Sequence, residues 1–191
     1  MGLFGPDFDP AKFGIKLKVI SKRLELGAKK KTEVALRARK EVADCLKDET
    51  KHTRANIKVE HIIREDYMVD AMAMIEEYCL LLNNRKQNVK TDKKGVPHCS
   101  VHEAVDSIVW ATVCTPIADE CVELRELVRM LEAKYGEKYI RSVVQTAPED
   151  NPRIKKELIS RLNPDPPKEW IKEQYLITIA EAYNVPYGSV Q

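Results

Sequence analysis

Apolar residues recur every three to four positions along the first part of the chain, from Phe13 to Leu46. Asp9 and Pro10 stand directly before them. An aspartate is a good helix N-cap, and a proline fits the first helical position. No further proline occurs until Pro97. The pattern predicts one helix of about 36 residues, roughly 54 Å long at 1.5 Å per residue.

A polar segment at 47–51 ends this helix, and a second apolar pattern runs from Val59 to about Leu82. Because the connection is short, the second helix must turn back against the first, which gives an antiparallel hairpin over 10–82. Such a hairpin would leave an apolar seam in water, so further helices must cover it. We therefore predict an all-α fold.

The middle of the chain predicts a loop followed by shorter helices. Residues 83–99 are polar and rich in lysine, and they include Gly95 and Pro97, which favour a loop. Residues 100–147 open with a capping-box pattern and carry helical spacing that Gly136 interrupts. We expect short helices there.

The last part, 151–187, predicts two helices separated by a proline-containing linker at 163–167. In the final helix, Ile171, Tyr175 and Ile179 recur at four-residue intervals. This helix can leave a groove beside it that accepts an amphipathic helix from a partner. The alternative is that the same face is buried in the core. The length favours one domain over 1–191.

Composition favours a reduced compartment and no membrane span. The five cysteines are an odd number with irregular spacing, and the first residues lack the basic and apolar regions of a signal peptide. The longest largely apolar run, 108–114, has seven residues including Thr112, far fewer than the ~20 that cross a bilayer. We expect a cytoplasmic protein.

Charge is unevenly distributed, although the formal net charge is only +2. Residues 1–58 hold 15 Lys/Arg against 8 Asp/Glu, whereas residues 59–191 hold 17 against 22. This asymmetry indicates an anionic partner for the first part, or head-to-tail attraction between molecules.

The excess of positive charge lies on one side of the first predicted helix. At 100° per residue, its apolar positions fall within an arc of about 80°, and cations cover the opposite face. This predicted basic face comprises Lys16, Lys18, Lys22, Arg23, Lys29, Lys30, Arg37 and Lys40. It would suit a lipid leaflet, a nucleic acid or an acidic neighbour in a polymer. The alternative is an ordinary solvated face, which usually mixes charges of both signs.

All three phenylalanines lie near the N-terminus, at Phe4, Phe8 and Phe13. Phe13 falls on the apolar stripe of the first helix. The other two could insert into a lipid interface. The favoured alternative is that they fold back over the end of the hairpin as a hydrophobic staple.

Catalytic and metal-binding motifs are missing from the sequence. It has no Gly-rich phosphate loop, no HExxH and no Gly-x-Ser-x-Gly. His98, Cys99 and His102 interleave ligand types, whereas zinc sites usually pair them, so we expect no metal and no cofactor. Glu60 and Arg64 are spaced for a surface ion pair. The chain is expected not to be an enzyme.

Several segments resemble the increased sodium tolerance family of ESCRT-III-like proteins. The most specific is the segment VEHIIREDY at 59–67. The others are KKKTE at 29–33, ARKEVAD at 38–44, EYC at 77–79, LL at 81–82, IVWA at 108–111, AKY at 133–135 and YNVPY at 183–187. The resemblance covers about residues 10–188, in order.

The resemblance implies an ESCRT-III core, with a long helical hairpin, shorter helices packed on it and a C-terminal helix folded back. It implies a role in endosomal sorting, multivesicular body formation and membrane remodelling, with peripheral recruitment from the cytoplasm to endosomes. The implied partners are a charged multivesicular body protein and the AAA ATPase of the pathway. By position, Ile171 and Tyr175 would belong to the partner-helix groove, and Lys18 and Lys29 to filament contacts.

Two departures from the family pattern qualify these expectations. The 83–99 segment is longer and more polar than in the family. Family members usually continue to a short motif that docks on the ATPase, whereas the sequence stops at Gln191. Either these residues are the core part of a longer chain, or any ATPase regulation by them is indirect. A nucleic-acid-binding role for the basic face is the alternative function. That face lacks stacking aromatic rings, which disfavours recognition of single strands.

Overall fold

A computed structural model of the chain describes residues 8–187, and this part consists of helices and their connections, with a lone β-bridge between Lys93 and Val96. This confirms the predicted all-α class. The α-helices are α1 Pro10–Leu46, α2 His52–Asn84, α3 Lys86–Thr91, α4 Cys99–Cys114, α5 Ile117–Glu120, α6 Glu123–Tyr135, α7 Glu137–Gln145, α8 Lys156–Leu162 and α9 Glu169–Ala182. Two 3-10 turns, η1 Glu49–Lys51 and η2 Pro148–Asp150, complete the described elements.

The first helix begins and ends close to its predicted bounds. The carboxylate of Asp9 accepts hydrogen bonds from the backbone N–H groups of Ala11 at 2.8 Å and Lys12 at 3.2 Å. Asp9 is therefore the N-cap that the sequence predicts. At the other end, Asp48 accepts from the N–H of Thr50 at 3.0 Å and closes the short turn into α2.

Contacts divide the chain into two compact units, and α1 and α2 contribute to both. One unit comprises Met1–Gly27 with Ala71–Leu162, and the other comprises Ala28–Asp70 with Asn163–Gln191. We call them the bundle unit and the hairpin unit. The expectation of a single domain over 1–191 stays a prediction.

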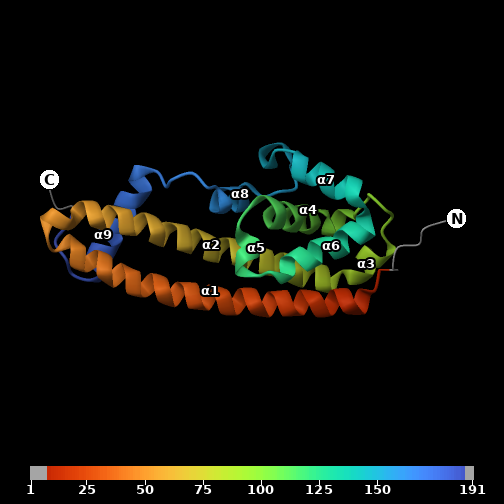
Figure 1. Cartoon of the computed structure of the whole chain (residues 1–191), viewed down its shortest axis with the longest axis horizontal. Coiled ribbons are helices and arrows are strands. Elements are labelled where there is room, and N and C mark those ends of the chain that lie inside the picture. Colours follow the sequence, from red (N-terminus) through yellow and green to blue (C-terminus); the bar gives the residue numbers. More distant parts are fainter. Residues whose placement is uncertain (1–7, 188–191) are drawn as a thin grey trace. The chain divides into compact units, whose positions relative to one another are not determined.

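In the hairpin unit, the ends of α1 and α2 that meet at η1 run antiparallel, and α9 lies against them (Figure 1). The three helices share one apolar core because α9 contributes buried side chains to the same cluster as the hairpin. The buried members of this cluster are Val42, Ala43, Cys45, Leu46, Ala55, Val59, Ile62, Ile63, Leu176, Ile179, Ala180 and Val185.

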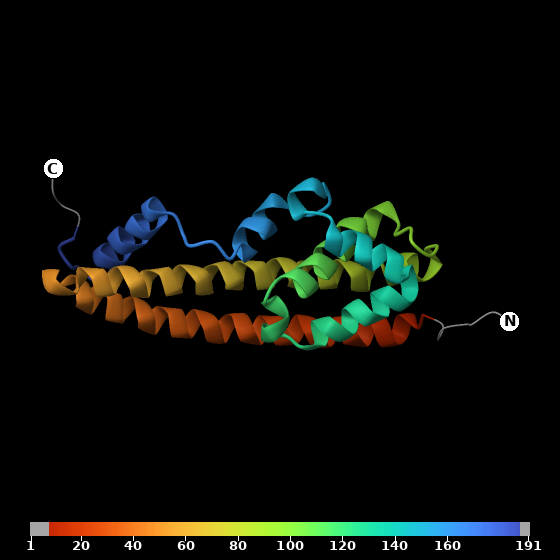
Figure 2. The same cartoon turned by 45° about the horizontal axis from the view of Figure 1, so that its top comes forward.

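In the bundle unit, α4 is the central element, with α6 and α7 packed close to it (Figure 2). Every residue from Ala104 to Thr112 is buried, which explains the apolar run in this part of the sequence. The one carboxylate within that run, Asp106, is 1% exposed. It accepts hydrogen bonds from the hydroxyl of Tyr139 and, at 3.1 Å, from the amide of Asn151, so its charge is not left unpaired.

The prediction of a loop over 83–99 is wrong for its first half. The second helix continues to Asn84, and α3 occupies Lys86–Thr91. Tertiary contacts account for the helix, because Val89 is fully buried and the amide of Asn88 donates to the hydroxyl of Ser100 at 3.1 Å. A single buried side chain in a polar segment leaves no periodic signal in the sequence.

Candidate functional site

Seven of the eight residues of the predicted basic face are exposed, and Lys16 is partly buried. They lie along α1, which is one uninterrupted helix. Lys16, Lys18, Lys22 and Arg23 belong to the bundle unit, and the remaining four belong to the hairpin unit. Their exposure agrees with the predicted outer side of α1, whereas their role in assembly or membrane binding stays a prediction.

Three of these cations, however, are paired with carboxylates of the same chain. Lys16 binds Glu126, and Arg23 binds Glu123 at 2.7 Å, both on α6. Lys22 binds Glu25 at 2.9 Å. The expectation of a face that carries only positive charge is thus wrong for the bundle unit, because α6 brings acidic residues against α1 from about a hundred positions away.

Four predicted cations stay exposed and form no ion pair with any other residue among 8–187. They are Lys18 in the bundle unit and Lys30, Arg37 and Lys40 in the hairpin unit. Because these side chains are exposed, their charge is available to an anionic surface.

The sequence pattern did not reveal an apolar stripe on the same side of α1. Ile15, Val19 and Leu26 are 64%, 40% and 55% exposed. At 100° per residue they fall within about 40° of one another. Exposed β-branched and leucine side chains in a row are typical of a surface that another molecule covers. A helical wheel can show this stripe when apolar residues outside the arc of core positions are considered by themselves.

The last helix is divided between core and surface. Ile179 is only 3% exposed and belongs to the core of the hairpin unit, so its assignment to an open groove is wrong. Ile171 and Tyr175 pack against the same core and remain partly exposed. Burial in the hairpin core thus increases along α9 from Ile171 to Ile179. A four-residue repeat in the sequence cannot show this change.

Tyr175 also makes a polar contact that fixes the position of its ring. Its hydroxyl donates to Asp66 on α2 at 3.0 Å, and the guanidinium of Arg39 lies 6.0 Å from its ring centre. Burial of the phenol, reinforced by the negative charge of Asp66, raises the pKa of Tyr175 above its usual value. The residue therefore stays neutral and acts as a hydrogen-bond donor.

Of the three N-terminal phenylalanines, Phe8 and Phe13 pack against each other. The ring of Phe8 packs on that of Phe13, with centroids 5.0 Å apart, and the amine of Lys134 lies 5.6 Å above it. Phe8 therefore folds back onto the bundle unit, as in the staple alternative. Phe4 lies outside the described residues.

Residues considered for chemistry do not assemble into a reactive or metal-binding site. Among residues 8–187, no three His, Cys, Asp or Glu side chains converge as metal ligands would. Cys121 is buried, and its thiol points to Glu123 at 3.5 Å. Glu60 and Arg64 form the expected ion pair at 3.0 Å. Nor does any helix in the described range combine the length and apolar character that crossing a bilayer requires.

The arrangement defines an ESCRT-III-like helical protein. A crystal structure of the N-terminal domain of S. cerevisiae Ist1, in complex with the Did2 MIM motif, is similar with a TM-score of 0.83 and 26% identity. The match covers 100% of this chain and 98% of that one. The chain belongs to the Ist1 family, whose model, described as "Regulator of Vps4 activity in the MVB pathway", matches residues 15–186.

Two curated relatives agree with this assignment. The Vacuolar protein sorting-associated protein IST1 of Saccharomyces cerevisiae is 29% identical over 189 residues, which covers 94% of this chain and 61% of that protein. An IST1-like protein of Dictyostelium discoideum is 29% identical over 185 residues, covering 96% of this chain and 47% of the relative. The chain thus spans about half to three-fifths of the relatives' lengths. The family description is that of a regulator, which agrees with the expectation that the chain is not an enzyme.

Proposed function

We propose that this chain regulates ESCRT-III assembly, and through it the AAA ATPase of the multivesicular body pathway, by binding a helix of an ESCRT-III partner. The observation that carries the proposal is the position of α9. Its inner side is anchored in the hairpin core, while Ile171 and Tyr175 remain partly exposed beside it. Half-exposed apolar side chains on a fixed helix are the usual anchors of a helix-in-groove interaction.

The related S. cerevisiae domain supports this proposal, since it was crystallised with a MIM motif from Did2. A charged multivesicular body protein of that kind is the proposed partner here. In the proposal, the chain is cytoplasmic and reaches endosomes only as a peripheral component, through its partner and through anionic surfaces.

The second part of the proposal concerns anionic surfaces. In the bundle unit, Lys18 supplies unpaired charge and the apolar stripe of Ile15, Val19 and Leu26 supplies hydrophobic contact. In the hairpin unit, Lys30 and Lys40 supply unpaired charge. Cations beside apolar side chains are the combination that binds a lipid interface or an acidic neighbour in a filament. Basic charge alone would serve nucleic acid equally well, whereas the apolar stripe favours lipid or protein.

Partner binding is tested by titrating a fluorescent peptide of the Did2 MIM motif into the chain. Ile171→Asp should abolish binding, because it places an unpaired charge in an apolar contact. Gln174→Asp is the matched control, since Gln174 is exposed on the same helix. Equal affinity of the Ile171 variant and the native chain would remove the groove from the proposal.

Surface binding is tested by sedimentation with anionic vesicles at physiological salt. Lys18→Glu together with Lys30→Glu should release the chain, whereas Lys156→Glu with Lys168→Glu, an equal charge change at exposed lysines elsewhere, should not. A parallel gel shift with duplex DNA measures the alternative function. Retention of vesicle binding by the α1 variant would exclude α1 as the membrane-binding surface.

A further inference from the structure

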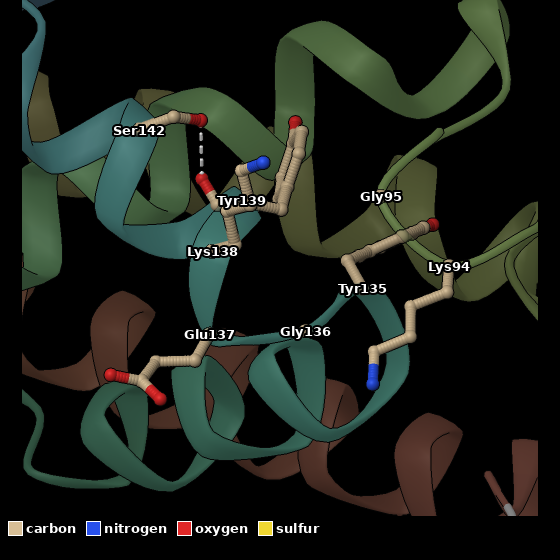
Figure 3. A pocket seen from close by; sticks show the side chains of 8 residues that line it. All are labelled: Lys94, Gly95, Tyr135, Gly136, Glu137, Lys138, Tyr139 and Ser142. Atoms are coloured by element: carbon tan, nitrogen blue, oxygen red, sulfur yellow. Dashed lines mark hydrogen bonds between the residues drawn. The ribbon is translucent and has the colours of Figure 1, made fainter.

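A cavity of about 560 Å³ lies in the bundle unit, where the 93–96 turn meets the corner between α6 and α7 (Figure 3). Its size falls within the roughly 300–1,000 Å³ of small-molecule sites. The cavity is lined by Lys94, Gly95, Tyr135, Gly136, Glu137, Lys138, Tyr139 and Ser142. No residue of α1, α2 or α9 lines it, so it is separate from the surfaces considered above.

Two glycines with positive φ shape this cavity. Gly95 has φ of 76° and Gly136 has φ of 95°, values that residues with a side chain rarely adopt. Gly136 separates α6 from α7, and a Cβ atom there would lie 2.7 Å from the Cε atom of Lys94. The absence of a side chain at Gly136 therefore leaves room for Lys94 at the cavity wall.

The charges that line the cavity leave two lysines uncompensated. The carboxylate of Glu137 is taken up by Arg141, one turn further along α7. Lys94 and Lys138 are exposed and form no ion pair with any residue in the described range. Lys94 comes from the turn and Lys138 from α7; both line the cavity, and their amines point in different directions from its wall (Figure 3).

The remaining polar groups of the wall are internally satisfied. The hydroxyl of Tyr135 donates to Asp92 at 2.7 Å, and that of Ser142 donates to the carbonyl of Tyr139 at 2.7 Å. Asp92 is held further by the backbone N–H of His98 at 3.0 Å. The two lysine amines are therefore the groups of the wall that are left for a ligand.

We propose that this cavity binds a small ligand that carries two or more phosphate groups, either free in solution or as the headgroup of a lipid. Each lysine offers three N–H donors and a point charge, a recurrent means of holding phosphate. A ligand with a single carboxylate would satisfy only one of the two amines. Separate phosphate groups on one small molecule satisfy both.

The first experiment measures binding of inositol hexakisphosphate to the whole chain by calorimetry. Lys94→Glu with Lys138→Glu should weaken binding roughly 100-fold, on the order expected for the loss of two charge-assisted hydrogen bonds. Lys156→Glu with Lys168→Glu changes the net charge equally at exposed lysines outside the cavity and the 93–96 turn, and should have little effect. Equal losses in both variants, or no binding by the native chain, would overturn the proposal.

A neutral variant tests the cavity itself. Ser142→Trp fills the space without changing charge at an exposed position, so it should abolish binding while helical content stays the same. In the native chain, the amide resonances of Gly95 and Gly136 should shift as ligand is added, which locates the site without any substitution. Ligand-induced shifts confined to other residues would contradict it.

Vesicles distinguish the two sources of phosphate. If the ligand is a headgroup, vesicles that carry a bisphosphorylated inositol lipid should bind the native chain more tightly than the Lys94/Lys138 variant, in which only the contribution of α1 remains. Vesicles matched in charge with phosphatidylserine provide the control. If the native chain binds inositol hexakisphosphate but shows no preference for the inositol-lipid vesicles, the ligand is one that is free in solution. The α1 variants separate the two proposals. If they lost vesicle binding but bound inositol hexakisphosphate as the native chain does, the result would concern α1 in the proposed function and not this cavity.

Discussion

Tyr175 and Arg39 hydrogen bond to the same oxygen of Asp66, Tyr175 from α9 and Arg39 from α1. One partly buried carboxylate on α2 thus joins three helices of the hairpin unit. The complete interaction needs all three helices in place, because each donor and the acceptor come from a different helix.

Tyr175→Phe removes the hydroxyl and keeps the ring. We expect the free energy of unfolding to fall by about 1 kcal/mol, the usual cost of one hydrogen bond whose acceptor keeps another donor. Urea denaturation measures this change. Tyr183→Phe, at an exposed residue that follows α9, is the control and should leave stability unaltered. Equal stability of the native chain and the Tyr175 variant would show that the Asp66 contact contributes nothing.

Ile179→Ala should strongly lower the free energy of unfolding, although the four-residue repeat of α9 predicted Ile179 to line a groove. Because the side chain is fully packed in the hairpin core, its loss should cost about 2–4 kcal/mol. Ile57→Ala, at a 69% exposed isoleucine on α2, should change stability by less than about 0.5 kcal/mol. Similar effects of the two substitutions in thermal denaturation would contradict the assignment of Ile179 to the core.

Acid should loosen the turn between α1 and α2. A hydrogen bond from Lys51, followed by those from Thr50, lowers the pKa of Asp48 from 3.8 to about 2. Because the folded state holds the lower pKa, this contribution to stability is complete above pH 3.8 and is lost as pH falls toward 2.

Asp48→Asn should therefore flatten the dependence of the melting temperature on pH within that window. Glu49→Gln, in the same exposed turn, is the control and should leave the native dependence in place. The measurement is a series of thermal melts between neutral and acidic pH. If the Asp48 variant and the native chain gave parallel curves, the turn would not be the acid-sensitive element.

The five thiols should react in two classes. Cys99 and Cys114 are exposed, whereas Cys45, Cys79 and Cys121 are buried. Burial also raises the pKa of Cys121 to about 11, which suppresses the reactive thiolate at neutral pH. A thiol reagent should label two cysteines of the native chain and five after denaturation, as counted by mass spectrometry. Labelling of Cys121 in the folded protein would show that the bundle unit opens around the α5–α6 connection.

The apolar stripe of α1 gives a further prediction. Ile15→Ser with Leu26→Ser should change the free energy of unfolding by no more than about 1 kcal/mol, because both side chains are largely exposed. The same pair should reduce vesicle binding or self-association, measured by sedimentation. Val34→Ser, also exposed on α1 but outside the stripe, is the control. If the double variant sedimented as the native chain does, charge alone would account for the interactions of α1.

The sequence predicted the elements whose signals are local. The bounds of α1 followed from Asp9 and from an apolar repeat that continues to Leu46, and the structure confirms them. The helix at Lys86–Thr91 was missed because only Val89 is buried there, and one buried residue makes no pattern. Local propensity is a weak guide where a distant contact decides the conformation.

The surfaces were predicted less well than the helices, and the reason is again distance along the chain. The charge of Arg23 is offset by Glu123, which a helical wheel of α1 cannot include. Ile179 and Ile171 occupy equivalent places in the sequence repeat, yet only Ile171 remains partly exposed. Exposure depends on where α9 meets the hairpin, and that geometry is set by three helices together.

The way the hairpin unit ends has a mechanical consequence. Val185 is buried beside the end of α9, and the ring of Tyr187 rests edge-on against His52, 5.5 Å between centroids. Tension applied to the chain beyond Tyr187 would first detach this ring, then withdraw Val185, and then peel α9 away one turn at a time. Contacts broken in series resist far less force than contacts sheared together, so this end is where an unfolding motor would gain its first hold.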